Sequence, residues 1–403
     1  MRVLLLSWEF PPHIVGGLGK HIMDLAPELA RQGMEVHLIT PLLRGGEKHE
    51  ITSDGVHVYR VEPPNMDSYG FVSYVQHTNS LMEAAARTLA AETGELDIIH
   101  AHDWLAAHAG VALKHEWHRP LVTTIHATER GRQGGYIGGG HAAQVNHIEW
   151  WMTYESWRII ACSSFMAHQI NNYFGTPLDK IDVVPNGVYI SPDPFTSEGQ
   201  RLAFRRNYAQ DDEPLVYYVG RLVYEKGLHI LIDCWPQVQE VFPNARLVIA
   251  GTGAYLHSLK HRAWALGIGA AVNFAGFITD EERDKLYHCA DVAVFPSLYE
   301  PFGIVALEAM AACCPVVVAE TGGLTEVVKL HETGLTVHPN DPGSLAWGIL
   351  HTLQHPEWSQ ARANNALVVT RDVFNWRHIA SETIQVYQRA FDDWVQSSWG
   401  KVW

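Results

Sequence analysis

The sequence is poor in cysteine and in long apolar runs. The cysteines are odd in number and form no Cys-x-x-Cys pair (Cys162, Cys234, Cys289, Cys313 and Cys314). We therefore expect neither a disulfide framework nor a zinc–cysteine site, and a reducing cytoplasmic location follows as the expectation. The apolar start of the chain is too short for a signal-peptide core. No stretch reaches the roughly 18 consecutive apolar residues of a membrane-spanning helix.

Basic residues are also scarce. Lysine and arginine number 29 against 44 aspartates and glutamates, which gives a net charge of −15 with histidine neutral. Nonspecific nucleic-acid binding depends on neutralising phosphates with lysine and arginine, so no nucleic-acid partner is expected. Residues 1–185 carry 13 basic against 20 acidic side chains. An anionic membrane would repel that surface, so membrane association is not expected either.

Short apolar runs rich in β-branched residues alternate with longer amphipathic stretches throughout the chain. Near-continuous apolar runs are typical of parallel strands that helices cover on both faces. The pattern predicts an α/β protein with doubly wound parallel sheets. The expected strands are Val3–Ser7, Val36–Thr40, Asp97–His100, Leu121–His126, Ile159–Ser163, Asp182–Pro185, Leu215–Gly220, Arg246–Ala250, Val272–Phe274, Val292–Pro296, Val316–Ala319 and Leu335–Val337.

The alternation stops and restarts near the middle of the 403 residues. Pro185-Asn186-Gly187 ends one strand, and the proline-rich Ser191-Pro192-Asp193-Pro194 reads as a linker. We predict two Rossmann-like domains, residues 1–187 and 200–372, facing a central cleft. A final segment, 373–403, contains an amphipathic helix (Trp376–Trp394) that we expect to pack back toward the N-terminal domain.

Charged side chains follow two predicted strands of the second domain. Arg221 and Lys226 lie between a strand and a helix, where two cations would suit a diphosphate. Glu300 precedes the apolar helix that starts near Phe302, and Glu308 lies about one and a half turns into it. Carboxylates accept strong hydrogen bonds from sugar hydroxyls. Ordinary surface solvation of the cations and helix capping by Glu300 are the alternatives.

The first domain offers a glycine pair, Gly16-Gly17, between a strand and a helix, which would let an anionic ligand approach the backbone. His126 ends a predicted strand and opens a polar cluster. His100 and His102 alternate on a strand, but no third metal ligand lies near them in sequence. No Asp-x-Asp triplet occurs. We therefore predict no metal site, and a diphosphate would be neutralised by cations and helix dipoles.

Taken together, these motifs resemble retaining glycosyltransferases of the GT-B fold, specifically glycosyltransferase family 4 and the related glycogen and starch synthases. The resemblance runs nearly end to end. Its most specific part is the combination of two pairs of residues. One pair is Glu300 and Glu308, which have seven residues between them, and the other is Arg221 and Lys226. The remaining motifs are Gly16-Gly17, His100-Ala101-His102-Asp103-Trp104, Pro185-Asn186-Gly187-Val188, Gly251-Thr252-Gly253 and Thr321-Gly322-Gly323.

The resemblance implies a role for each matched residue. The expected catalytic residues are His126, Arg221, Lys226 and Glu300. The expected donor-binding residues are Gly16, Gly17, Gly251, Phe302, Gly303, Ile304 and Glu308. On the acceptor side we expect Asp103, Glu129 and Arg130. No cofactor and no essential metal are implied.

The implied activity is transfer of a hexose, glucose most simply, from ADP-glucose or UDP-glucose with retention at the anomeric carbon. A soluble carbohydrate acceptor such as an α-glucan chain suits the acidic first domain. Glycogen synthases commonly carry Lys-Thr where this chain has Ile14-Val15, a difference that favours the broader family. The alternatives are a lipid-linked or small-molecule acceptor, an inverting GT-B transferase or sugar-nucleotide epimerase, and a two-lobed sugar-binding protein.

Overall fold

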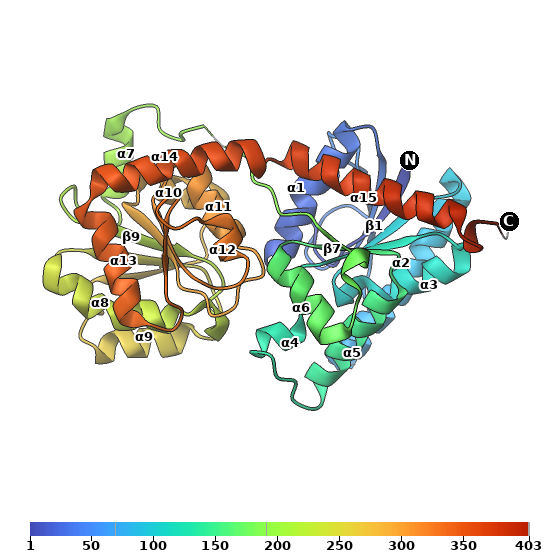
Figure 1. Cartoon of the computed structure of the whole chain (residues 1–403), viewed down its shortest axis with the longest axis horizontal. Helices are drawn as coiled ribbons and strands as arrows, with labels where there is room; N and C mark the ends of the chain where they lie inside the picture. Colours follow the sequence, from blue (N-terminus) through green and yellow to red (C-terminus); the bar gives the residue numbers. More distant parts are fainter. Residues whose placement is uncertain (69, 191, 402–403) are drawn as a thin grey trace. The chain divides into compact units, whose positions relative to one another are not determined.

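The computed structural model describes residues 1–68, 70–190 and 192–401. Over these residues the chain divides into two compact units (Figure 1). The N-terminal unit comprises Met1–Gly187 and the segment from Trp376 onward, and the C-terminal unit comprises Val188–Asn375. Ser191 of the predicted linker and the last two residues of the predicted C-terminal segment lie outside the described residues.

The N-terminal unit is built on an eight-stranded sheet of order β3-β4-β2-β1-β5-β6-β7-β8. All neighbouring strands are parallel except β3, which pairs antiparallel with β4 at one edge. The strands are β1 (Arg2–Leu6), β2 (Glu35–Pro41), β3 (His49–Ile51), β4 (His57–Val61), β5 (Ile98–His102), β6 (Leu121–Ile125), β7 (Arg158–Ala161) and β8 (Ile181–Val183).

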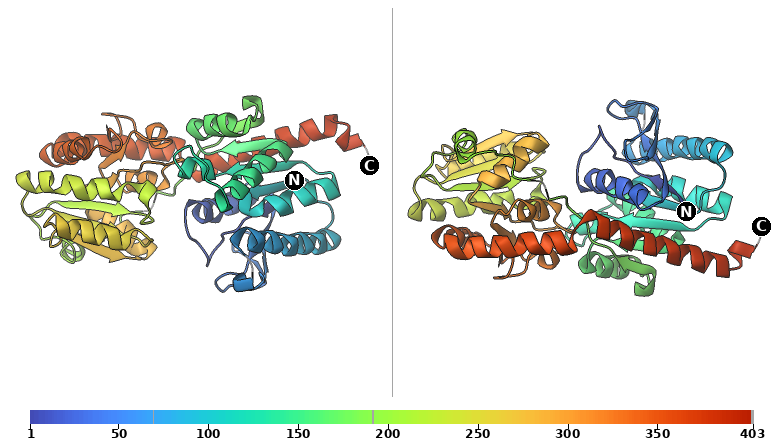
Figure 2. Two further views of the ribbon diagram at one scale, coloured as in Figure 1. Left: turned by 90° about the horizontal axis from the view of Figure 1, so that it is seen from below. Right: turned by 90° about the horizontal axis from the view of Figure 1, so that it is seen from above.

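Helices cover both faces of this sheet (Figure 2). On β1, Val3 and Leu5 pack into one apolar core with helices α1 and α15. Leu4 and Leu6 point the other way, into a second core with α2 and α3. Successive side chains of a strand point to opposite faces of the sheet, and here both faces are buried. The helices are α1 (Gly17–Arg31), α2 (Phe71–Thr93), α3 (Ala107–Trp117), α4 (Glu129–Arg132), α5 (His141–Glu155), α6 (Ser164–Phe174) and α15 (Trp376–Gln396).

The C-terminal unit has a six-stranded, all-parallel sheet of order β11-β10-β9-β12-β13-β14. Its strands are β9 (Leu215–Val219), β10 (Arg246–Ala250), β11 (Val272–Gly276), β12 (Val292–Phe295), β13 (Val316–Ala319) and β14 (Leu335–Val337). Its helices are α7 (Glu198–Arg205), α8 (Leu228–Val241), α9 (Leu256–Ala265), α10 (Asp280–Cys289), α11 (Ile304–Ala311), α12 (Leu324–Val327), α13 (Pro342–Gln354) and α14 (Pro356–Val373). In Figure 1, α8, α9 and α13 lie on one side of this sheet and α7, α10, α11 and α14 on the other.

All twelve predicted strands are present, and the predicted fold class is confirmed. His126 lies one residue beyond β6, which ends at Ile125. The edge strand β3 and its neighbour β4 were not predicted. In β4 buried residues alternate with partly exposed ones, and one of the two buried residues is Arg60. Its guanidinium donates to the carbonyls of Glu47 and Pro11 and to the carboxylate of Glu50, which compensates its burial.

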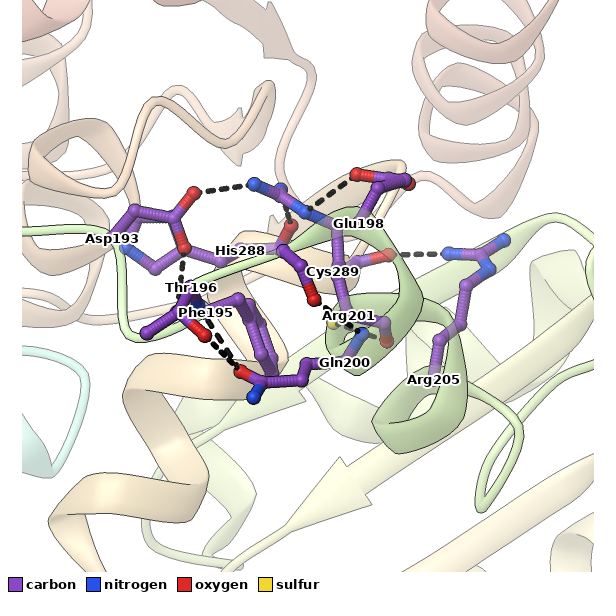
Figure 3. Close-up of polar contacts among 10 residues, drawn as sticks. Asp193, Phe195, Thr196, Glu198, Gln200, Arg201, Arg205, His288 and Cys289 are labelled. Carbon is purple, nitrogen blue, oxygen red and sulfur yellow. Dashed lines mark hydrogen bonds and ion pairs between the residues drawn. The ribbon is translucent and has the colours of Figure 1, made fainter.

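Two arginines of α7 hold the first helix of the C-terminal unit against the end of α10 (Figure 3). Arg201 donates to the carbonyl oxygen of His288 at 2.8 Å and pairs with Asp193 and Glu198. Arg205 donates to the carbonyl oxygen of Cys289 and to Asp291. Cations at a helix C-terminus satisfy its free carbonyls and complement its dipole.

The loop after β9 returns so close to β12 that one of its residues has to be glycine. Gly227 has φ +68, and a Cβ there would lie 1.9 Å from the carbonyl oxygen of Pro296. We expect Gly227→Ala to destabilise the protein by at least about 1–3 kcal/mol, since the backbone strain alone has that size. Chemical unfolding followed by fluorescence would measure the change.

Gly199→Ala is the matched control for this substitution. Gly199 lies in α7, and the nearest atom to a Cβ at this position would be Ser197 Oγ, at 3.9 Å. Alanine in a helix is favoured over glycine by about 0.5–1 kcal/mol, so this variant should be as stable as the parent or more so. Equal stability of the Gly227→Ala variant and the parent would show that the loop has another conformation available.

Candidate active site

The predicted donor-binding residues of the C-terminal unit lie in loops that follow its parallel strands. Arg221 and Lys226 follow β9, Gly251 follows β10, and Glu300 follows β12. These strands are neighbours in the sheet, so their carboxyl ends open at one edge. Backbone hydrogen bonds connect the loop after β9 to the loop after β12, because the amides of Leu298 and Tyr299 both donate to the carbonyl oxygen of Glu225.

A close ion pair connects two of these loops. Lys226 Nζ lies 2.6 Å from Glu300 Oε2, and Ser297 Oγ donates to the same oxygen at 3.2 Å. Both charged side chains are largely buried, with 17% and 10% of their surface exposed. A charge-assisted hydrogen bond in such surroundings fixes both groups in position. The structure thus brings together two predicted catalytic residues that are 74 positions apart in sequence.

The other two charged residues differ in their surroundings. Arg221 is half-exposed, and its guanidinium is 3.8 Å from the carboxylate of Glu225. Glu308 is largely buried within α11, where Arg283 Nη1 lies 3.5 Å from its carboxylate. Arg221 is thus the more accessible cation, whereas Glu308 already has a cationic neighbour.

The N-terminus of α11 is formed by tight backbone packing. Phe302 and Gly303 are buried, and Ile304 is the first residue of the helix. Gly303 has φ +109, and a Cβ there would contact Leu324 at 2.6 Å. Gly323 N donates to the carbonyl oxygen of Glu300 at 2.9 Å. The free amides at such a helix start favour an anion.

In the N-terminal unit, the glycine pair is part of a loop that Glu9 organises. Glu9 Oε2 accepts hydrogen bonds from Val15 N at 2.8 Å and from Gly16 N at 3.1 Å. Gly17 then begins α1. The structure therefore places Gly16 and Gly17 at the carboxyl end of β1, where they were predicted, and adds Glu9, which the sequence argument missed.

Several imidazoles gather at the carboxyl ends of β5 and β6. His102 Nδ1 lies 3.2 Å from His126 Nε2, and His21 Nδ1 lies 2.6 Å from Asn186 Oδ1. The Trp376 ring of α15 is 5.4 Å from the ring of His21. Burial, reinforced by Arg132, lowers the pKa of His126 to about 3, and burial together with His126 lowers the pKa of His21 to about 3. These rings are therefore neutral at pH 7.

The predicted acceptor-side residues are engaged in shaping the loop after β6. Buried Asp103 accepts a hydrogen bond from His126 N at 2.7 Å. Glu129 N donates to the buried carboxylate of Glu149 at 2.9 Å. Arg130 lies over the Tyr173 ring at 4.6 Å. Desolvation raises the pKa of Asp103 to about 6 and that of Glu149 to about 8.

The comparisons with known proteins agree with this architecture. The family model described as Glycosyltransferase Family 4 matches residues 15–191, and that described as Glycosyl transferases group 1 matches residues 200–368. Sucrose-phosphate synthase from Thermosynechococcus elongatus superposes with a TM-score of 0.83 at 26% identity, over 97% of this chain and 99% of that one. The two parallel α/β sheets, together with this structural similarity, identify the fold as that of a GT-B glycosyltransferase.

Sequence relatives extend over nearly the whole chain. An uncharacterized glycosyltransferase of Methanocaldococcus jannaschii is 40% identical, with 97% of this chain and 99% of the relative aligned. The glycogen synthase of Mycobacterium tuberculosis is 37% identical, with 97% and 95% aligned. The chain belongs to glycosyltransferase family 4. Within the described ranges, no helix combines the length and the hydrophobicity that a membrane crossing requires.

The raised pKa of Glu149 has a consequence for stability. Between the ordinary carboxyl pKa of about 4.5 and about 8, the folded protein keeps a proton that the unfolded chain releases. The contribution of Glu149 to the free energy of unfolding is therefore fully present below pH 4.5. It decreases as the pH rises and is lost once the pH has passed through about 8. Glu149→Gln cannot ionise and keeps an acceptor for Glu129 N. We expect its melting temperature, relative to the parent, to rise steadily from pH 5 to pH 8.

Calorimetric melting of parent and variant at each pH measures this difference, and the buried histidines contribute equally to both. Glu357→Gln, which changes an exposed glutamate, serves as the control and should show a constant difference. A melting-temperature difference for Glu149→Gln that does not vary with pH would mean that Glu149 is ionised in the folded protein.

Proposed function

We propose that this glycosyltransferase moves a hexose, glucose most simply, from a nucleoside diphosphate sugar to a soluble carbohydrate acceptor with retention at the anomeric carbon. The observation that supports this most directly is the Lys226–Glu300 pair in the loops after β9 and β12. It places a cation and a carboxylate side by side, as a donor with both a diphosphate and a sugar requires.

The cations and helix dipoles of the C-terminal unit would stabilise the leaving group. In our proposal Arg221 and Lys226 bind the diphosphate, and the backbone of Phe302, Gly303 and Ile304 contributes the N-terminus of α11. Charge that develops on the departing phosphate is stabilised by groups already in place, which lowers the barrier. No essential metal takes part in this scheme.

The sugar would react without a covalent bond to the protein. The diphosphate departs on the face by which the acceptor hydroxyl enters, through an oxocarbenium-like state, and catalysis depends on positioning. We propose that Glu300 and His126 contact the donor sugar. His126 is neutral because its pKa is lowered to about 3 by burial, so it serves as a hydrogen-bonding group and not as a cation.

An α-glucan chain is the acceptor that we favour. It is supported by the 37% identity to a glycogen synthase over nearly the whole chain, and by the acidic first 185 residues. A lipid-linked or small-molecule acceptor is the alternative. Family membership supports an enzyme over a sugar-binding protein. Incubation with individual nucleotide sugars, with and without glycogen, separates these candidates, because only an enzyme releases nucleoside diphosphate and only a glucan-specific one depends on glycogen.

The diphosphate cations provide the first test of this function. Arg221→Ala or Lys226→Ala should lower turnover by two or more orders of magnitude (about 3 kcal/mol or more), because a charge is lost where negative charge develops. Steady-state release of nucleoside diphosphate would measure this. Lys329→Ala, which removes an exposed lysine of the same unit, should retain the parental rate. Treatment with EDTA should leave the parental rate unchanged, and a metal-reversible loss of all activity would count against the scheme.

The two glutamates of the donor site should differ in what they bind. We expect Glu300→Gln to lower kcat more than it weakens nucleoside diphosphate binding, because the charge that supports the sugar is lost. Glu308→Gln should instead weaken binding of ADP or UDP by about 1–3 kcal/mol, through loss of a charged hydrogen bond to the ribose. Titration calorimetry with ADP and UDP, beside turnover and melting curves, measures both effects. Equal losses of diphosphate affinity in the two variants would refute this division of roles.

A further inference from the structure

Three histidines from distant parts of the N-terminal unit converge in a way that the proposed transfer reaction does not require. His21 comes from α1, His102 from the end of β5, and His126 from the residue after β6. One ring nitrogen from each lies within 4.8 Å of the others. No other group of three or more histidine, cysteine or acidic side chains in the described part of the chain comes together in this way.

Two of these rings carry buried nitrogens without a hydrogen bond. His21 and His102 are 4% and 0% exposed, and the Nε2 atom of each finds no partner among the described residues. His21 donates from Nδ1 to Asn186 Oδ1, so its Nε2 carries the lone pair. An unsatisfied buried acceptor of this kind is costly unless a ligand uses it. A hydrogen bond from the opposite ring nitrogen is also the usual support of a metal-binding histidine.

The spacing of the nitrogens is close to that of a tetrahedral metal site. Bonds of about 2.0–2.1 Å place two nitrogens about 3.4 Å apart around a zinc ion. His102 Nδ1 and His126 Nε2 are 3.2 Å apart and share a hydrogen bond, which a metal ion between them would replace, while His102 Nε2 is the unpartnered nitrogen of that ring. The rings of His21 and His126 are 4.7 Å apart between centroids, and the ligand nitrogens of the three histidines lie within 4.8 Å of one another, so a bound ion would draw them closer together. His126 is the partly exposed member, which gives an ion a way in.

We propose that His21, His102 and His126 form a binding site for one divalent transition-metal ion of the kind that prefers imidazole, such as Zn²⁺ or Co²⁺. Mg²⁺ and Mn²⁺ prefer oxygen ligands and would not be held. We further propose that the bound ion inhibits transfer, because it takes the ring nitrogen of His126 away from the donor sugar. The binding site stands on the three side chains alone, whereas the inhibition rests on the proposed function.

Cobalt is the probe that tests the site. Four-coordinate Co²⁺ absorbs strongly in the visible region, whereas six-coordinate Co²⁺ on surface histidines absorbs only weakly. We expect the metal-free parent to develop the strong absorption at one equivalent of Co²⁺, and Zn²⁺ to displace it. His21→Gln and His126→Gln should each lower the absorption and the Zn²⁺ affinity at least tenfold. Circular dichroism would establish that both variants are folded.

His168→Gln is the matched control, because it removes an exposed histidine of the same unit and should leave the absorption unchanged. Absorption that is weak in the parent, or that survives in both folded cluster variants, would mean adventitious surface binding only and would overturn the site.

Release of nucleoside diphosphate with and without one equivalent of Zn²⁺ tests the inhibition separately. A loss of at least tenfold that EDTA reverses is expected. If cobalt binds as described but Zn²⁺ leaves the rate unchanged, the inhibitory part is wrong. If the metal-free protein releases no diphosphate from any nucleotide sugar, the proposed function fails, while the cobalt spectrum still decides whether the site exists.

Discussion

Burial of both faces of the two parallel sheets is the constraint on which the rest of the structure depends. A strand covered by helices on both sides has little room for polar side chains along its length, so chemistry collects where the strands end. In the C-terminal unit β9, β12 and β13 are buried almost throughout, and the charged residues come in the loops that follow them. The same rule places the glycine pair after β1 and His126 after β6.

The polar clusters at the strand ends of the two units resolve the cost of burial in different ways. The C-terminal unit keeps charges and pairs them, as Lys226 with Glu300 and Glu308 with Arg283. Each partner is a counter-charge, without which the buried ion would be expensive. The histidine cluster of the N-terminal unit gives up charge instead, although Arg60 elsewhere in that unit keeps its charge and pairs with Glu50. Desolvation holds its clustered imidazoles in the neutral form and raises the pKa of Asp103 to about 6.

The sequence predicted those features whose signal is local. Twelve apolar runs predicted twelve strands, and the predicted amphipathic helix Trp376–Trp394 lies within α15. The predicted position of Glu300 ahead of α11 also follows from a local pattern, an acidic residue before an apolar helix. The edge strand β3 and its neighbour β4 lack such a signal, because β3 is three residues long and β4 contains the buried Arg60. Their pairing depends on contacts that neither segment encodes alone.

Contacts between segments that are distant in sequence have no such local signal and could not be predicted. The sequence predicts no metal site at His100 and His102, because no third ligand lies near them along the chain. The third and fourth imidazoles come from α1 and from the end of β6, and only the order β1-β5-β6 of the sheet brings these segments together. Glu9 shows the same limit, since its carboxylate becomes a loop-organising group only when the chain turns back on itself at Val15 and Gly16.

A parallel sheet therefore does more than collect polar groups at one edge. It also decides which of them remain charged, because the helices that pack over the edge set how much water each group keeps. Tyr387 and Trp376 of α15 lie against His100 and His21, respectively, so α15 contributes to excluding water from these rings. Arg221, by contrast, is half-exposed and keeps its charge at little cost. The electrostatic difference between the neutral imidazole cluster and the Lys226–Glu300 pair is thus a property of the helix layers, and it follows from the same packing that makes the strands apolar.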